Sequence, residues 1–184
     1  MRFSVLLASL LLCAQAGAQN YPEKAVTMVV AFPAGGSADL IARAIAEHMT
    51  ASWKQNVLVV NRAGASGNIG TESVVRAAPD GHTLLYGTTA LASSPAVYPK
   101  LGYNVLTDLA PVSLIVNQAN VLVVHPSLPA KSVKELIALA KARPSELNYG
   151  SSGVGGFGHI SGELFTLMTN TKMIHVPYKS SAPS

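Results

Sequence analysis

Three glycine-rich stretches are the residues best suited to chemistry in this sequence, and that chemistry is the binding of a small anion. They read Phe32-Pro-Ala-Gly-Gly-Ser-Ala-Asp39, Asn61-Arg-Ala-Gly-Ala-Ser-Gly-Asn68 and Ser151-Ser-Gly-Val-Gly-Gly-Phe-Gly-His159. Glycine has no Cβ and adopts positive φ readily, so successive backbone N–H groups can turn toward one point. A helix that begins directly after such a loop adds unpaired N–H groups and the positive end of its dipole. We therefore expect a seat for a small carboxylate rather than for a large cofactor.

The third stretch allows more than one interpretation. Its residues Gly153-Val-Gly-Gly-Phe-Gly158 match the G-x-G-x-x-G pattern of dinucleotide-binding loops. That pattern needs an Asp or Glu about 20 residues further on to bind the ribose, and no acidic residue follows Glu163. A nucleotide site, a backbone nest for a small anion and a tight turn without a ligand therefore all remain open.

Other common chemistries are disfavoured by residue type and spacing. No loop ends in the Gly-Lys-Ser/Thr of a P-loop, and the glycines around Ser66 and Ser152 have the wrong offsets for a nucleophile elbow. The five histidines lack H-E-x-x-H spacing, so no metal site and no cofactor is expected. For Asp39 and His159, contact with a ligand competes with a capping or packing role at the helix that follows, and a carboxylate at 39 would repel an anion.

Each glycine loop is expected to join a buried strand to an amphipathic helix. Short apolar runs bounded by turn residues predict parallel strands over residues 26–31, 57–60, 83–88, 112–116, 121–124, 147–150 and 173–176. Apolar residues at helical spacing predict three packing faces, formed by Leu40, Ile41, Ala44, Ile45, Met49 and Trp53, by Val133, Leu136, Ile137 and Ala140, and by Ile160, Leu164, Leu167 and Met168. Residues 93–109 are expected to be irregular, with one short helix. The whole pattern predicts an α/β protein.

The N-terminus is typical of a secretory signal peptide. Arg2 precedes an apolar stretch that runs to Cys13, and small-x-small patterns follow, so we expect cleavage after Ala18. The stretch is shorter than the roughly 20 residues that a membrane-spanning helix needs, and Leu12 is too bulky for a lipidation signal. Without Arg2 the 13 basic residues fall to 12 against 9 acidic ones, a net charge of +3. These basic residues form no cluster, so nucleic-acid binding is not expected.

An ordered set of motifs between Tyr21 and about Pro183 resembles the Bug family, the extracytoplasmic solute receptors of tripartite tricarboxylate transporters. Besides the three glycine loops, the motifs are Tyr21-Pro-Glu-Lys, Pro79-Asp-Gly-His-Thr83, Asp108-Leu-Ala-Pro-Val112, Tyr149-Gly-Ser-Ser-Gly153 and His175-Val-Pro-Tyr-Lys179. The resemblance covers essentially the whole chain after the signal peptide. It is far more specific than any one glycine loop.

The resemblance implies a periplasmic-binding-protein-like α/β fold, a Venus flytrap of two doubly wound domains that close on a carboxylated solute. After a signal peptide at 1–18, residues 19–118 are expected to form domain 1 and residues 119–184 a partial domain 2. The implied function is capture of a di- or tricarboxylate, an amino acid or an aromatic acid in the periplasm, for membrane permease subunits and without catalysis. The alternative is a nucleotide-binding enzyme that uses the loop from Gly153 to Gly158.

The residues that the resemblance places at the ligand come from all three loops and from the end of the third strand. They are Phe32, Ala34, Gly35, Gly36, Ser37, Asp39, Gly64, Ala65, Gly67, Asn68, Thr88, Ser151, Ser152, Gly153, Gly155 and His159. Family members continue after a Val-Pro-Tyr-Lys-Gly segment, whereas here Ser180 replaces the glycine. We therefore expect a truncated or frameshifted product or a fragment, with exposed sheet edges, uncovered apolar helix faces and weakened binding.

Overall fold

The protein folds around two parallel sheets. The computed structural model describes residues 21–178, so the expected signal peptide at 1–18 and the residue Ser180 lie outside the described residues. The first sheet contains β1 (Val26–Val30), β2 (Val57–Asn61) and β3 (Thr83–Tyr86) in the order β2-β1-β3. The second pairs β4 (Asn148–Ser151) with β5 (Ile174–Pro177). The α/β class and its parallel strands are confirmed.

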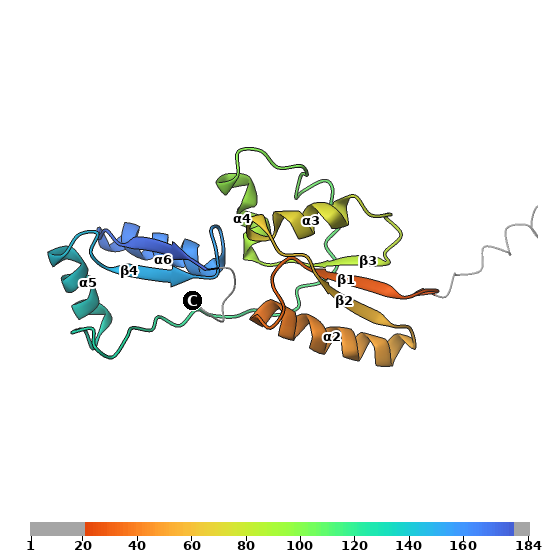
Figure 1. Ribbon diagram of the computed structural model, residues 1–184, viewed down its shortest axis with the longest axis horizontal. Coiled ribbons are helices and arrows are strands. Elements are labelled where there is room, and N and C mark those ends of the chain that lie inside the picture. The colour runs from red at the N-terminus through yellow and green to blue at the C-terminus, as the bar shows by residue number, and fades with distance from the viewer. Residues whose placement is uncertain (1–20, 179–184) are drawn as a thin grey trace, which may run out of the picture.

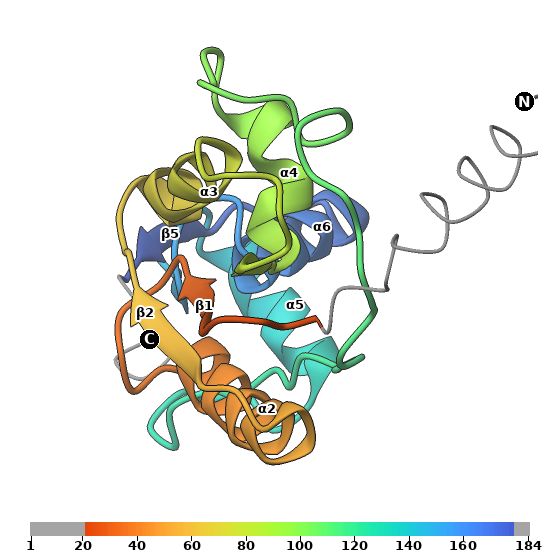
Figure 2. The same ribbon diagram turned by 90° about the vertical axis from the view of Figure 1, so that its right-hand side faces the viewer.

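Helices cover both faces of the first sheet. Helix α2 (Ser37–Trp53) lies on one face, and α3 (Asn68–Val75) and α4 (Thr89–Val97) lie on the other (Figures 1 and 2). The central strand β1 is therefore enclosed, and the side chains of Val26, Val29 and Val30 are almost completely buried. A continuous valine-rich strand is typical of a parallel sheet that is covered on both sides.

Helix α2 packs on the sheet through smaller residues than the sequence predicted. Ala42 and Ala46 are buried, whereas Leu40 is 61% exposed and Ala44 is also exposed. Because two residues along an α-helix turn about 200°, Leu40 and Ala44 point away from the face that Ala42 and Ala46 form. Their predicted place in the packing face was wrong. The other predicted residues do pack against the core, namely Ile41, Ile45, Met49 and Trp53.

The strands predicted at 112–116 and 121–124 do not form. This part of the chain runs as an extended connection between the two sheets (Figure 1). Val112 is 86% exposed and Val121 is 81% exposed. The composition favours a strand, but a strand also needs a neighbour that accepts and donates backbone hydrogen bonds. No backbone pairing of this segment with either sheet occurs within residues 21–178.

The second sheet is joined by two helices, and one of them has an uncovered apolar face. Helix α5 (Val133–Ala142) begins at Ser132, whose Oγ accepts the Glu135 N–H at 3.2 Å, as the capping box predicted. Its Val133 is 55% exposed, contrary to the predicted packing face.

In α6 (Phe157–Thr169) no residue is fully buried. The predicted apolar residues of α6 are all exposed by 38% to 78%, namely Ile160, Leu164, Leu167 and Met168.

The region predicted to be irregular with one short helix, residues 93–109, contains the end of α4 and no other helix. Helix α4 starts at Thr89, before the predicted region, and continues through Pro95 to Val97. Among all helices in residues 21–178, none has both the length and the apolar character needed to cross a bilayer.

Candidate functional site

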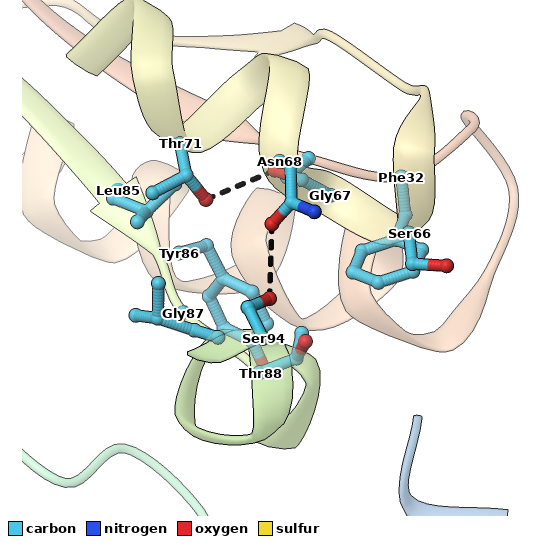
Figure 3. Close-up of a pocket in the computed structure, with 12 residues that line it drawn as sticks. Phe32, Ser66, Gly67, Asn68, Thr71, Leu85, Tyr86, Gly87, Thr88 and Ser94 are labelled. Carbon is cyan, nitrogen blue, oxygen red and sulfur yellow. Dashed lines mark hydrogen bonds between the residues drawn. The ribbon is translucent and has the colours of Figure 1, made fainter. Parts of the chain in front are cut away.

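A pocket opens where β1 and β3 end at the carboxyl edge of the first sheet. The chain leaves β1 toward α2 on one face and leaves β3 toward α4 on the other, so the direction of the connections reverses between these two strands. Open α/β sheets bind ligands at such switch points. The lining residues are Ala31, Phe32, Ser66, Gly67, Asn68, Thr71, Leu85, Tyr86, Gly87, Thr88, Leu91 and Ser94 (Figure 3).

The lining of the pocket combines apolar and neutral polar groups. Its enclosed volume is only about 10 Å³, about the space of one water molecule, and the rest of the hollow is open to solvent. Phe32, Leu85 and Leu91 supply apolar walls, and hydroxyl and amide groups supply the polar ones. None of the described lining residues carries a charge. An anion bound here would be held by neutral donors.

Asn68 is the best-oriented donor in the pocket. It follows the short 3₁₀ turn Ala65–Gly67 and begins α3. Its Oδ1 accepts a hydrogen bond from the Tyr103 hydroxyl at 2.7 Å and lies 2.9 Å from the Ser94 hydroxyl, whose single proton is shared with the Ala90 carbonyl at 2.7 Å. These two contacts fix the amide plane, and the amide nitrogen points to the Ser66 side of the pocket (Figure 3). Thr88 adds a hydroxyl that makes no capping bond at the start of α4.

In the first glycine loop, the anion seat predicted from the sequence is filled by the protein itself. The Asp39 carboxylate is 2% exposed and accepts the Gly35 N–H at 2.9 Å. Arg43 Nε donates to the same oxygen at 3.0 Å, and Asn61 Nδ2 donates to the other oxygen at 2.9 Å. The hydrogen bond from Arg43, helped by those from Gly35 and Asn61, lowers the pKa of Asp39 to about 2 although burial opposes it. Asp39 lies in the first turn of α2 as predicted, but the N-cap is Gly36.

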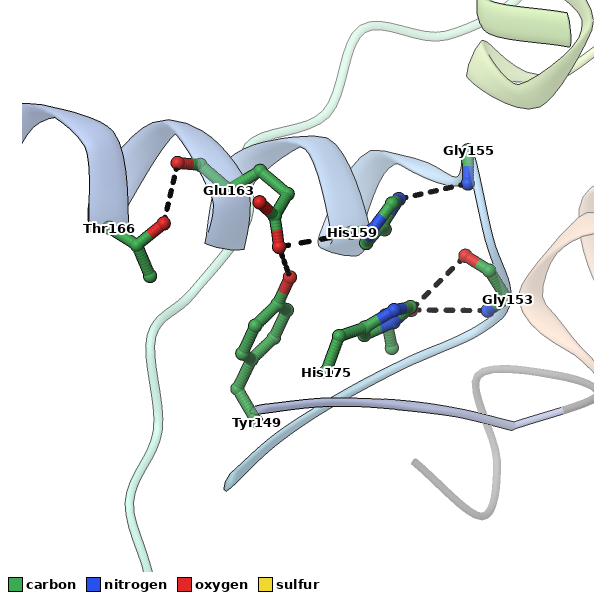
Figure 4. Close-up of polar contacts among 8 residues, drawn as sticks. Tyr149, Gly153, Gly155, His159, Glu163, Thr166 and His175 are labelled. Carbon is green, nitrogen blue, oxygen red and sulfur yellow. Dashed lines mark hydrogen bonds and ion pairs between the residues drawn. The ribbon is translucent and has the colours of Figure 1, made fainter. Parts of the chain in front are cut away.

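The third glycine loop is likewise held by its own side chains. The Gly155 N–H donates to His159 Nδ1 at 3.0 Å, and the Gly153 N–H donates to Ser151 Oγ at 3.2 Å (Figure 4). Ser151 Oγ lies 2.6 Å from His175 Nε2. These two N–H groups are thus already paired, which leaves them unavailable to a pyrophosphate and disfavours the nucleotide interpretation. The contact with Gly155 favours the capping role for His159 over contact with a ligand.

The third glycine loop also contacts helix α4, which covers the first sheet beside the pocket. The Ser93 hydroxyl on α4 donates to the Gly155 carbonyl at 2.6 Å. A Cβ added to Gly153 would lie 3.6 Å from the hydroxyl oxygen of Ser66, which lines the pocket. The loops of the two sheets therefore face each other at the mouth of the pocket.

The pocket contains some of the predicted site residues and omits others. Phe32, Gly67, Asn68 and Thr88 line it. The remaining predicted residues lie outside the lining, namely Ala34, Gly35, Gly36, Ser37, Asp39, Gly64, Ala65, Ser151, Ser152, Gly153, Gly155 and His159. For those residues, contact with a ligand stays a prediction.

Sequence reasoning missed several lining residues. They are Ala31, Ser66, Thr71, Leu85, Tyr86, Gly87, Leu91 and Ser94. Leu91 and Ser94 lie three and six residues after Thr88, so they share a side of α4, but this helix overlaps a region that was predicted to be irregular. Within residues 21–178, no cluster of three or more acidic, histidine or cysteine side chains could hold a metal ion.

Stability is expected to fall on acidification because of His175. Its ring stacks on those of His159 and Tyr149, with ring centres 4.1 Å and 5.0 Å away, and the Tyr149 hydroxyl donates to the Glu163 carboxylate at 2.6 Å (Figure 4). Burial, followed by His159, lowers the pKa of His175, while Glu163 opposes the shift. The folded state then binds fewer protons than the unfolded state, whose histidine pKa is about 6.5. The contribution of His175 to the free energy of unfolding is fully present above that pH and is lost as the pH falls through the lowered pKa of the folded state.

Thermal melting at about pH 7.5 and at about pH 5.5 checks this expectation. His175→Phe keeps an aromatic ring but cannot titrate, so the difference in melting temperature between the two pH values should shrink. His48→Gln, on the exposed side of α2, should leave the difference unchanged. An unaltered pH profile in His175→Phe would rule out His175 as the source.

A pocket with neutral lining at the switch point of a doubly wound parallel sheet is where open α/β proteins bind their ligands. Residues 41–184 match the tripartite tricarboxylate transporter family receptor, TctC, and the chain belongs to this family. Protein BugT of Bordetella pertussis (strain Tohama I) is 40% identical over 182 residues, which are 98% of this chain and 56% of that protein. The chain spans about half the length of the curated relatives it matches.

Solved structures of similar proteins agree with this family and fold. The R. palustris protein Rpa4515 with adipate shares 42% identity at a TM-score of 0.84, over 89% of this chain and 55% of that one. MatC from Rhodopseudomonas palustris with bound malate shares 30% identity at a TM-score of 0.78, over 89% of this chain and 56% of that one. The periplasmic binding protein BugD shares 33% identity at a TM-score of 0.74, over 89% of this chain and 55% of that one. The predicted family and the predicted periplasmic-binding-protein-like fold are confirmed.

Proposed function

We propose that the protein captures a small carboxylate for a tripartite tricarboxylate-type transporter and catalyses no reaction. The observation that carries this proposal is the oriented amide of Asn68, whose nitrogen points into a pocket lined by hydroxyl groups and free of charged side chains. A hydrogen bond to a charged group contributes about 1.5–3 kcal/mol, more than one to a neutral group. Such donors therefore favour a carboxylate over an uncharged solute.

The ligands of two similar proteins support the choice of carboxylate. Rpa4515 holds adipate and MatC holds malate, both of which are dicarboxylates. The pocket's apolar walls at Phe32, Leu85 and Leu91 suit the methylene groups between two such carboxylates. A dicarboxylate with a short aliphatic chain is thus the preferred solute.

Catalysis is disfavoured at the buried pair of side chains that resembles a nucleophile and its base. Ser151 Oγ and His175 Nε2 are 2.6 Å apart, but Ser151 is only 3% exposed. Its hydroxyl already accepts the Gly153 N–H and contacts the Gly153 carbonyl. A substrate could not reach this oxygen without rearrangement of the loop, so the pair supports the loop rather than a reaction.

The proposed location and partners are supported by the family. Receptors of this type serve membrane permease subunits, and we place the protein in the periplasm with its domains divided as 19–118 and 119–184. The two separate sheets and the extended connection between them support that division.

Thermal-shift measurements on the purified chain test the proposed function. Adipate and malate should raise the melting temperature with increasing concentration, because a ligand that binds only the folded state stabilises it. NAD and ATP should have no effect. Stabilisation by a nucleotide and by neither carboxylate would overturn the proposal.

A further inference from the structure

Asp39, Arg43 and Asn61 form a closed network beside the pocket. Besides the bonds to the Asp39 carboxylate described above, an Arg43 guanidinium nitrogen donates to Asn61 Oδ1 at 3.0 Å. Each of the three side chains therefore contacts the other two. Asp39 and Arg43 lie one turn apart on α2, whereas Asn61 ends β2.

This network reaches the pocket through the backbone after β1. Asn61 Nδ2 also donates to the Phe32 carbonyl at 3.1 Å. Phe32 lines the pocket, and its ring packs against Gly67, where an added Cβ would lie 3.5 Å from Phe32 Cε2. A displacement of Asn61 would therefore move the Phe32 wall and the turn before Asn68.

The carboxylate is the centre of the network because all the other groups donate to it. The Asp39 side chain is 3% exposed and the Arg43 side chain is 51% exposed. The first turn of α2 adds the positive end of the helix dipole. A buried carboxylate with three donors holds its position firmly, and removal of the carboxylate leaves those donors without an acceptor.

We propose that Asp39 acts as a built-in anion, whose carboxylate fills the seat made by Gly35, Arg43 and Asn61 and so positions Phe32 for solute binding. Asp39 is a positioning residue and does not touch the solute. The effect on solute affinity rests on the proposed carboxylate-binding function. The existence of the anion seat does not depend on that function.

Asp39→Ala tests the proposal because it empties the seat and leaves the donors in place. The dissociation constant for adipate should rise about tenfold, a change of about 1.4 kcal/mol in binding free energy. Excess sodium formate should enter the empty seat, raise the melting temperature of this variant and restore its affinity toward that of the unmodified chain. Sodium chloride at equal ionic strength serves as the salt control.

Asp39→Asn is the matched control, since its amide fills the same space and leaves no room for formate. Formate should neither stabilise nor rescue this variant. Equal responses of Asp39→Ala and Asp39→Asn to formate would overturn the proposal that Gly35, Arg43 and Asn61 form an anion seat. Unchanged adipate affinity in Asp39→Ala would overturn the positioning role.

Arg43→Gln extends the test to a half-exposed residue, whose replacement is compatible with folding even if Asp39→Ala does not fold. Its affinity for adipate should fall by a smaller factor, because Asn61 still holds both Asp39 and Phe32. Wild-type affinity in this variant would contradict the network. If the unmodified chain binds no carboxylate, the proposed function fails, and stabilisation of Asp39→Ala by formate still decides whether the seat exists.

Discussion

Asn68→Asp is expected to weaken adipate binding at least about a hundredfold, which corresponds to about 2.7 kcal/mol. The aspartate has the same shape and keeps an oxygen for the hydroxyls of Ser94 and Tyr103. The amide nitrogen that points into the pocket becomes a carboxylate oxygen. The bound anion then loses a donor and meets a like charge in a partly buried site, where electrostatic repulsion is stronger than in bulk water.

Isothermal titration calorimetry with adipate measures this effect, and circular dichroism melting checks that the fold remains. Asn117→Asp is the control, since it adds the same charge on the exposed connection between the sheets. It should bind adipate as the unmodified chain does. Equal dissociation constants for Asn68→Asp and Asn117→Asp would remove Asn68 from the binding site.

Gly70→Ala is expected to lower the free energy of unfolding by about 2–3 kcal/mol, as overpacking of a close contact does. Gly70 lies where α3 crosses β1. A Cβ there would be 2.7 Å from both Ala31 Cβ and the Arg62 carbonyl oxygen, and 2.8 Å from Ala31 Cα. These atoms belong to the backbone or are attached directly to it, so they cannot rotate away, and α3 must move.

Gly102→Ala tests whether the cost depends on the rigidity of the contacted atoms or only on how close they are. A Cβ at Gly102 would approach Glu72 Oε1 even more closely, but that atom is the end of a flexible side chain. We expect a loss within about 0.5 kcal/mol. Urea denaturation at constant m-value measures both variants. A larger loss for Gly102→Ala than for Gly70→Ala would contradict the account.

The elements that depend on local sequence were predictable, and those that depend on distant partners were not. The valine-rich run at 26–30 forms a strand because several apolar residues in a row suit a covered parallel sheet. The run at 121–124 has the same character but remains extended and exposed. Strand formation needs a paired neighbour, and composition alone does not reveal whether one is present.

The loops of the candidate site were predictable, whereas their contacts were not. The sequence located the glycine loops before the helices, and ligand binding by these loops stays a prediction. The spacing of Gly35 and Asp39 placed a carboxylate about one helical turn away. The sequence could not show that this carboxylate fills the seat, because its partner Asn61 comes from a different strand. The pocket of the proposed function lies instead between β1 and β3, where Asn68 and Ser94 meet only after folding.

Calorimetric titration with adipate and with its diamide, adipamide, tests the central claim most directly. The two molecules have the same chain length, but only adipate carries negative charge. The pocket should bind adipate at least about tenfold more tightly, because a hydrogen bond to a charged group is the stronger one. Equal affinity for the two molecules, or tighter binding of adipamide, would contradict the assignment of the pocket as a carboxylate site.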